Sequence, residues 1–141
     1  MRITVPMYEK GRSFIMASGL VKAYGGHRFV YLHLLCQGFE NIGKAILLAR
    51  DYDKYGPELR GRFRHNLEAL LSELNVIHGG DFLSKNASTE LRELNKFYKQ
   101  HQLRYGDPVD FSTDVTTLQS DQMHTELVGH LDVLNQKFSA K

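Results

Sequence analysis

Apolar residues recur at three- and four-residue steps along most of this chain, the spacing typical of amphipathic α-helices. The pattern predicts five helices. The first covers residues 13–24 and the second residues 27–51. The third follows the Gly-Pro pair at 56–57 and ends before Gly79-Gly80, and the fourth extends from cap candidates at residues 86–90 to about residue 106. The last begins between Ser112 and Ser120.

The only strand signal, at residues 3–5, is too short to build a sheet. We therefore predict an all-α fold, an antiparallel four- to five-helix bundle that forms a single domain over residues 1–141. The predicted core comprises the residues at the centres of the apolar stripes: Phe39, Ile46, Phe63, Leu67, Leu70, Leu74, Leu94, Leu127, Leu131 and Leu134.

The second predicted helix is apolar on more than one side. Leu32, Cys36 and Phe39 recur on one side, whereas Leu34 and Ile42 lie on another. Such a helix is either central to the fold or shared between the core and a partner chain. A symmetric homodimer would bury the additional face.

The composition of the chain limits which classes of function the protein can have. The chain is 42% hydrophobic and 24% charged with a formal net charge of +2, so nucleic-acid binding would require local clustering of cations. The single cysteine, Cys36, lies in an apolar run and is interpreted as an inert core thiol. No secretory signal is apparent, and no apolar run reaches the ~20 residues of a membrane span, which predicts a cytoplasmic protein.

No motif indicates a metal or cofactor. The seven histidines include no pair at the i,i+4 spacing of two helical ligands, and there is no His-Glu-x-x-His sequence. The glycine-rich phosphate loop, the dinucleotide fingerprint and the Gly-x-Ser-x-Gly nucleophile motif are also absent from the sequence. We expect neither a bound metal nor a cofactor.

The first candidate binding or catalytic residues lie in the segment 60–71, where three arginines and a histidine precede an apolar stripe. On a continuous helix, His65 points away from that stripe, towards solvent or a partner chain, and Arg62 shares its face. Arg60 and Arg64 project elsewhere. Two interpretations carry equal weight: solvated surface cations, or recognition of an anionic ligand such as a nucleotide or RNA.

Two other pairs allow both a structural and a functional interpretation. Glu40 and Lys44 are one helical turn apart in an apolar segment, which favours a structural ion pair over catalysis. A functional role would place Glu40 opposite the arginines of another helix. Arg104 complements a helix C-terminal dipole, or binds a phosphate while Tyr105 stacks on a base.

The order of these residues resembles the HEPN (higher eukaryotes and prokaryotes nucleotide-binding) domains. The resemblance covers roughly residues 27–139 and includes Glu40 with Lys44, the His65-Asn66-Leu67 segment, and Arg104-Tyr105 near the end of a later helix. It implies a small helical bundle, a homodimer, and nucleotide or RNA binding in partnership with a minimal nucleotidyltransferase. Other members are metal-independent endoribonucleases of toxin–antitoxin systems.

The ribonucleases carry an Arg-x(4–6)-His motif, which Arg60 and His65 match formally. Gly61 stands where they usually have a polar residue, the motif usually lies on a later helix, and Asn66 replaces the more usual aspartate. Our leading hypothesis is therefore a non-catalytic nucleotide- or RNA-binding protein. Its candidate ligand-binding residues are Glu40, Lys44, Arg62, Asn66, Arg104 and Tyr105.

Two alternatives stay open. In the first, the protein is a ribonuclease in which Arg60 stabilises the charge that develops on the phosphate and His65 transfers a proton. In the second, it is a structural homo-oligomer without a ligand.

Overall fold

The computed structural model describes residues 3–100, 103 and 118–139. Over these residues the chain is helical and contains no β-strand, so the all-α prediction is confirmed. Five long helices are present: α1 (Thr4–Ala23), α2 (Arg28–Arg50), α4 (Leu67–His78), α5 (Lys85–Tyr98) and α7 (Asp121–Lys137). A short helix α3 (Tyr52–Tyr55) and a 3₁₀ turn η1 (Gly56–Glu58) connect α2 to the segment before α4.

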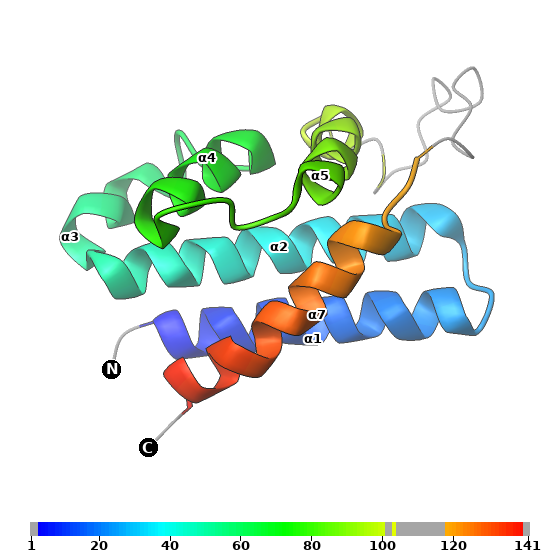
Figure 1. The fold of residues 1–141 in the computed structure, drawn as a ribbon, viewed down its shortest axis with the longest axis horizontal. Helices are drawn as coiled ribbons and strands as arrows, with labels where there is room; N and C mark the ends of the chain where they lie inside the picture. The colour runs from blue at the N-terminus through cyan, green and yellow to red at the C-terminus, as the bar shows by residue number, and fades with distance from the viewer. Residues whose placement is uncertain (1–2, 101–102, 104–117, 140–141) are drawn as a thin grey trace.

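Helix α2 is the central element. It forms an antiparallel hairpin with α1 and carries α4 and α5 on its other side, while α7 runs obliquely to the hairpin and contacts α1 and α5 (Figure 1). Twelve of its 23 residues are buried. The apolar side chains on several sides of α2 are thus covered by other helices of the same chain. A homodimer remains a prediction, but α2 does not require it.

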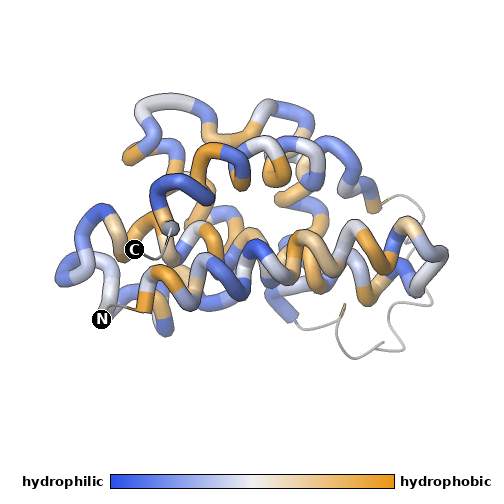
Figure 2. The backbone as a smooth tube through the Cα atoms, turned by 90° about the horizontal axis from the view of Figure 1, so that it is seen from below, coloured by the Kyte–Doolittle hydropathy of each residue, from blue (hydrophilic) through white to orange (hydrophobic). Residues whose placement is uncertain are grey.

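All ten residues of the predicted core are buried, as is Cys36. Hydrophobic and hydrophilic residues alternate along the helices at intervals close to one turn (Figure 2). On α7, the predicted face contributes Met123, Leu127, Leu131 and Leu134 to the core. The helical periodicity of the sequence therefore identified the core correctly.

Helix α1 starts nine residues earlier than predicted, at Thr4 rather than at residue 13. Pro6 lies in its first turn, where a missing N–H costs no intrahelical hydrogen bond. Helix α5 also starts slightly earlier, because the Ser84 side chain accepts a hydrogen bond from the Ala87 N–H and caps the helix. Helix α5 ends at Tyr98, earlier than the predicted end near residue 106, and a turn follows at residues 99 and 100. Residues 106–108 themselves lie outside the described residues.

The prediction of one continuous helix from residue 57 to residue 78 is wrong. Hydrogen-bonded turns replace it after η1, and α4 begins only at Leu67. His65 has a φ of 53°, a left-handed conformation that a continuing right-handed helix does not accommodate. Asn66 then caps α4 by accepting a hydrogen bond from the Ala69 N–H at 3.2 Å.

Two glycines allow α1 and α2 to approach closely. A Cβ atom at Gly11 would lie 2.9 Å from both the Gly38 carbonyl oxygen and the Ile42 nitrogen. A Cβ atom at Gly38 would lie 2.5 Å from the Ile15 side chain and 3.0 Å from the Gly11 carbonyl oxygen. Because the obstructing atoms include backbone, larger residues would force the two helices apart.

We expect Gly11→Ala to destabilise the protein by about 1–3 kcal/mol, the usual cost of overpacking a core. Gly129→Ala on α7 is the matched control, since an added Cβ there would meet no atom within 4 Å apart from its chain neighbours and the backbone of its own helix. That exposed helical position should gain roughly 0.5–1 kcal/mol from the better helix propensity of alanine. Urea denaturation of both variants measures the difference, and equal stabilities would contradict the close contact.

Candidate functional site

The carboxylate of Glu40 is buried in the middle of α2 and is only 6% exposed. Its Oε2 atom accepts hydrogen bonds from Lys44 Nζ at 2.6 Å and from the His65 backbone N–H at 3.1 Å. Its Oε1 atom accepts one from the Tyr98 hydroxyl at 2.5 Å and lies 3.0 Å from His65 Nδ1. The carboxylate therefore joins α2, the turn before α4 and the end of α5.

The environment of Glu40 favours its ionised form. Burial by itself raises the pKa of the carboxyl group, but the hydrogen bonds from Lys44 and Tyr98 and the charge of Lys44 outweigh it. The net result is a pKa below the usual 4.5. Burial, with the adjacent Glu40 charge, raises the pKa of Tyr98, so this hydroxyl stays protonated and donates. Burial likewise raises the pKa of Cys36, which is consistent with an inert thiol.

His65 is held from two directions. Its backbone N–H and its ring bind Glu40, and its carbonyl oxygen accepts a hydrogen bond from Asn95 Nδ2 at 3.0 Å. The expectation that His65 faces solvent or a partner from a helix surface is therefore wrong. The residue lies in a turn, its side chain is 32% exposed, and its ring meets the Tyr98 ring edge-on.

Sequence reasoning missed Asn95, although it is only 2% exposed and completes this network. Its Oδ1 atom accepts a hydrogen bond from the Glu68 N–H at 3.2 Å while its Nδ2 atom binds the His65 carbonyl. Asn95 thus satisfies backbone groups on both sides of the α4 N-terminus. The sequence did contain a signal for a buried polar residue: Asn95 is an amide that directly follows Leu94 and lies one turn before Tyr98 in an apolar stripe.

Of the three arginines before α4, Arg62 is the one held in ion pairs with neighbouring carboxylates. Its guanidinium lies 3.2 Å from a carboxylate oxygen of Glu73 and 3.5 Å from one of Glu58. Glu73 also accepts a hydrogen bond from the Tyr55 hydroxyl at 2.6 Å. These contacts tie the 55–62 segment to α4 and direct Arg62 away from a ligand.

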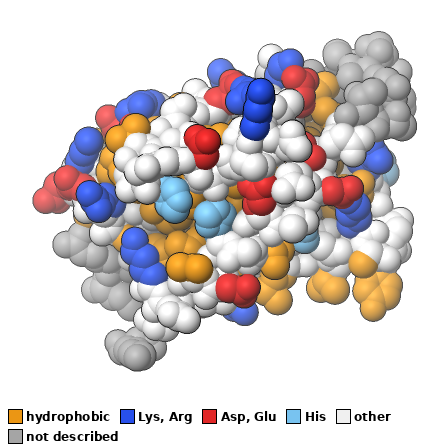
Figure 3. Space-filling model, in the orientation of Figure 1, with side chains coloured by type: hydrophobic (Ala, Val, Ile, Leu, Met, Phe, Trp, Pro, Cys, Tyr) orange, Lys and Arg blue, Asp and Glu red, His pale blue; other side chains and the backbone are white. Residues whose placement is uncertain are grey.

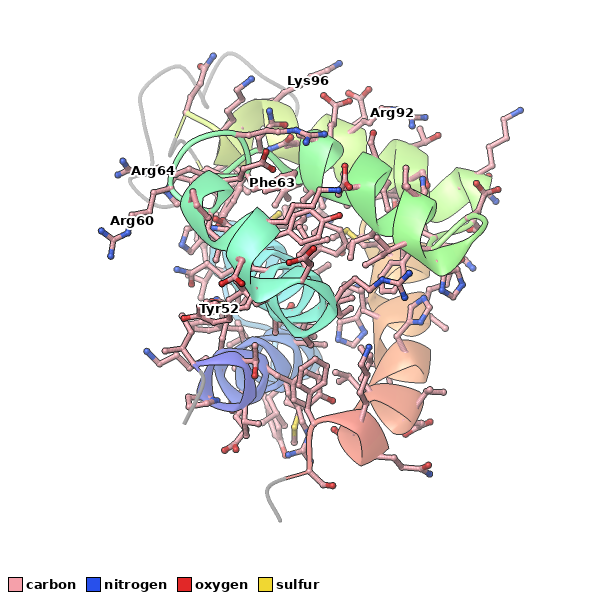
Figure 4. All side chains as sticks on the ribbon, turned by 90° about the vertical axis from the view of Figure 1, so that its left-hand side faces the viewer. Tyr52, Arg60, Phe63, Arg64, Arg92 and Lys96 are labelled. Carbon is pink, nitrogen blue, oxygen red and sulfur yellow. The ribbon has the colours of Figure 1, made fainter. Side chains whose placement is uncertain are left out.

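Arg60 and Arg64 differ from Arg62. Both are exposed and extend outward on the same side of the molecule, whereas Phe63 between them points into the core (Figure 4). Neither makes an ion pair or a hydrogen bond with the described residues. Arg104 and Tyr105, the last two predicted ligand-binding residues, lie outside the described residues.

A groove of about 730 Å³ adjoins the Glu40 network. It lies between the start of α1, the middle of α2 and the α3–η1 connection, and Lys44 and Arg60 both line it. The other lining residues are Ile3, Met7, Asn41, Leu48, Tyr52, Asp53, Gly56, Pro57 and Leu59. We call it the Lys44–Arg60 groove. It combines cations, an amide, an aromatic ring and apolar surface, which suits an organic anion.

The described residues contain no group of three or more potential ligands that could hold a metal ion. Within the same residues, no helix has the length and apolar character needed to cross a membrane. No protein-family model, curated protein sequence or solved structure matches the chain. Inferences about function therefore depend on the geometry of the site.

We expect Glu40→Ala to destabilise the fold by about 3 kcal/mol or more, because it leaves the buried groups of Lys44, His65 and Tyr98 without their acceptor. Tyr98→Phe removes one hydrogen bond to a charged group and should cost about 2 kcal/mol. The control is Glu93→Ala, which breaks an exposed pair with Lys96 and should cost less than about 0.5 kcal/mol. A Glu40→Ala variant as stable as Glu93→Ala would exclude this role for Glu40.

The same network predicts a dependence on pH. The pKa of Glu40 is lower in the folded state, so its ionisation stabilises the protein above about pH 4.5 and this contribution disappears as the pH falls through the folded-state pKa. The stability difference between wild type and Glu40→Gln should narrow on acidification from about pH 7 to about pH 3. A difference that does not change over this range would contradict an ionised Glu40.

Proposed function

We propose that this protein is a non-catalytic, HEPN-like module that binds a nucleotide or an RNA through the Lys44–Arg60 groove. The observation that carries the proposal is that one groove is lined by an exposed arginine, Arg60, which has no ion-pair partner among the described residues, together with a lysine and an aromatic ring. The resemblance of the sequence to HEPN domains supports the same class of ligand.

Each part of such a ligand has a complementary group in the groove. Arg60 offers a guanidinium fork with no partner among the described residues, the donor geometry best suited to a phosphate. Tyr52 provides a ring on which a base can stack, next to the apolar side chains of Met7 and Leu48. The volume is within the range of small-ligand sites.

Lys44 plays a secondary part in this proposal. Its ammonium group is 2.6 Å from Glu40, so much of its charge is already balanced, and its side chain is only 14% exposed. Arg60 therefore supplies most of the positive charge that an anion would meet, and Asp53 on the same groove opposes it. The ligand should depend on Arg60 more than on Lys44.

Binding is proposed rather than catalysis because the hydrogen bonds of Glu40 serve to hold α2, the turn before α4 and the end of α5 together. Glu40 faces four donor groups from three segments, which leaves its oxygens little capacity to accept a proton from a substrate. His65 sets the start of α4 through its backbone as much as through its ring. Asn66 caps α4.

We expect Arg60→Ala to weaken binding of ATP or of a short single-stranded RNA about tenfold, the loss of one charge-assisted contact to phosphate. Arg64→Ala is the matched control: it removes an equally exposed arginine on the same side that does not line the groove. Isothermal titration calorimetry at low ionic strength measures both. Equal losses would indicate non-specific electrostatic attraction, and undetectable binding by wild type would refute the proposal.

One observation favours the ribonuclease alternative. Glu40 Oε1 lies 3.0 Å from His65 Nδ1, and a carboxylate in that position keeps the proton on Nδ1 and leaves Nε2 as the basic nitrogen. Such a pair suits proton transfer to or from a ribose hydroxyl. Arg60, five residues earlier, would have to reach the same phosphate.

The two functions are separated by incubating the protein with labelled single-stranded RNA in the presence of a chelator. We expect no cleavage. His65→Asn is the informative variant, because asparagine tolerates the left-handed backbone and still donates to Glu40. Metal-independent cleavage by wild type that is lost in a folded His65→Asn variant would establish the ribonuclease and overturn the binding-only proposal.

The homodimer and a nucleotidyltransferase partner belong to the same proposal, since both follow from the HEPN resemblance. If neither binding nor cleavage is found, the structural homo-oligomer becomes the leading interpretation. Sedimentation of the ligand-free protein distinguishes a monomer from a species twice the chain mass of 16.2 kDa.

A further inference from the structure

A second groove, of about 440 Å³, lies between α4 and the C-terminal half of α7, with α2 beneath. Its apolar surface is provided by Ile46, Leu74, Ile77, Phe82, Val133 and Leu134. Its polar lining consists of four basic side chains: Arg50, His78, His130 and Lys137. No acidic residue lines it. We call it the His78–His130 groove.

Figure 3 shows this face, where two histidine side chains lie side by side above hydrophobic side chains, with Lys or Arg side chains close by. The floor is well packed: Ile46, Leu74, Phe82 and Leu134 are each less than 9% exposed. Val133 at the rim is 70% exposed. The groove therefore has a buried apolar base and a rim that is open to solvent.

The histidine side of the groove is held in place by ring contacts. His130 stacks on Phe82 with ring centroids 3.9 Å apart, and His78 meets both rings edge-on. His130 Nε2 lies 2.6 Å from the Phe82 carbonyl oxygen, which fixes a proton on that nitrogen. These contacts build one aromatic wall from α4, the following loop and α7.

The cations of the groove are available to a ligand. Arg50 is exposed at the last position of α2 and makes no ion pair or hydrogen bond with the described residues. Lys137, at the last position of α7, is also exposed and makes no ion pair in the described part of the chain. Two cations beside an apolar base, without a competing carboxylate in the lining, select an anion that has an apolar body.

We propose that the His78–His130 groove binds a small amphipathic carboxylate, with its apolar tail on the Ile46–Leu74–Leu134 floor and its carboxylate directed to Arg50 and Lys137. The charge pattern argues for this occupant over a neutral or cationic one. The groove is distinct from the Lys44–Arg60 groove in its lining residues, so the two proposals stand independently.

Octanoate is a suitable probe, with octan-1-ol as a neutral control and hexanoate as a shorter one. We expect saturable octanoate binding with amide shifts at His78, His130 and Leu134 in heteronuclear NMR spectra. Octan-1-ol should bind at least about tenfold more weakly, since it lacks the charge that Arg50 and Lys137 recognise. Each methylene removed should weaken binding up to about fourfold, the effect of about 0.8 kcal/mol of apolar burial.

The double variant Arg50→Ala/Lys137→Ala should bind octanoate about tenfold more weakly. Its charge-matched control is Arg92→Ala/Lys96→Ala, which removes two exposed cations from α5 outside the groove (Figure 4). Val133→Trp is a second, independent test: it changes an exposed rim residue, should leave the fold intact, and should block the groove.

Four results would overturn the proposal. The first is no saturable octanoate binding, and the second is equal affinity for octanoate and octan-1-ol. The third is a dimer that Val133→Trp dissociates, which would show that a second copy of the chain covers the groove. An unchanged octanoate affinity in Arg50→Ala/Lys137→Ala would also contradict the assigned position of the carboxylate.

Discussion

The fold depends on keeping the charge of Glu40 inside the protein. An ionised carboxylate in an apolar helix is strongly unfavourable unless donors replace its lost hydration. Here the replacements come from Lys44 on the same helix and from His65 and Tyr98, which lie 25 and 58 residues further along the chain. Solvating this one carboxylate therefore brings the α4 turn and the end of α5 onto α2.

This requirement also explains the unusual backbone before α4. His65 must present both its N–H and its ring to the same carboxylate, and it does so in a left-handed conformation that L-residues adopt at a cost. The helix then restarts at once, because Asn66 and Asn95 together satisfy the first N–H groups of α4. The hydrogen bonds to Glu40 hold His65 in its strained conformation, and that conformation in turn supplies two of the donors that stabilise the buried charge of Glu40.

Periodicity in the sequence was sufficient for the all-α class and for the ten predicted core residues, because both depend on the local repeat of apolar residues. It failed between residues 59 and 66, where Leu59, Phe63 and Leu67 keep helical spacing although the chain forms turns. The break is caused by contacts with Glu40 and Asn95, which are 25 residues before and 30 residues after His65. Local spacing contains no information about such distant partners.

The same limit applied to the arginines. A helical projection places Arg62 on the same face as His65, whereas the turn directs Arg62 to Glu58 and Glu73. Arg60 and Arg64 make no ion pair with the residues that the structure describes. The formal net charge of +2 likewise understates the local positive charge that a ligand meets at the His78–His130 groove. The carboxylates of Glu40 and Glu73 are engaged by structural partners, and the residues lining the His78–His130 groove include cations but no carboxylate. Local pairing, rather than overall composition, therefore determines which surfaces of this molecule attract anions.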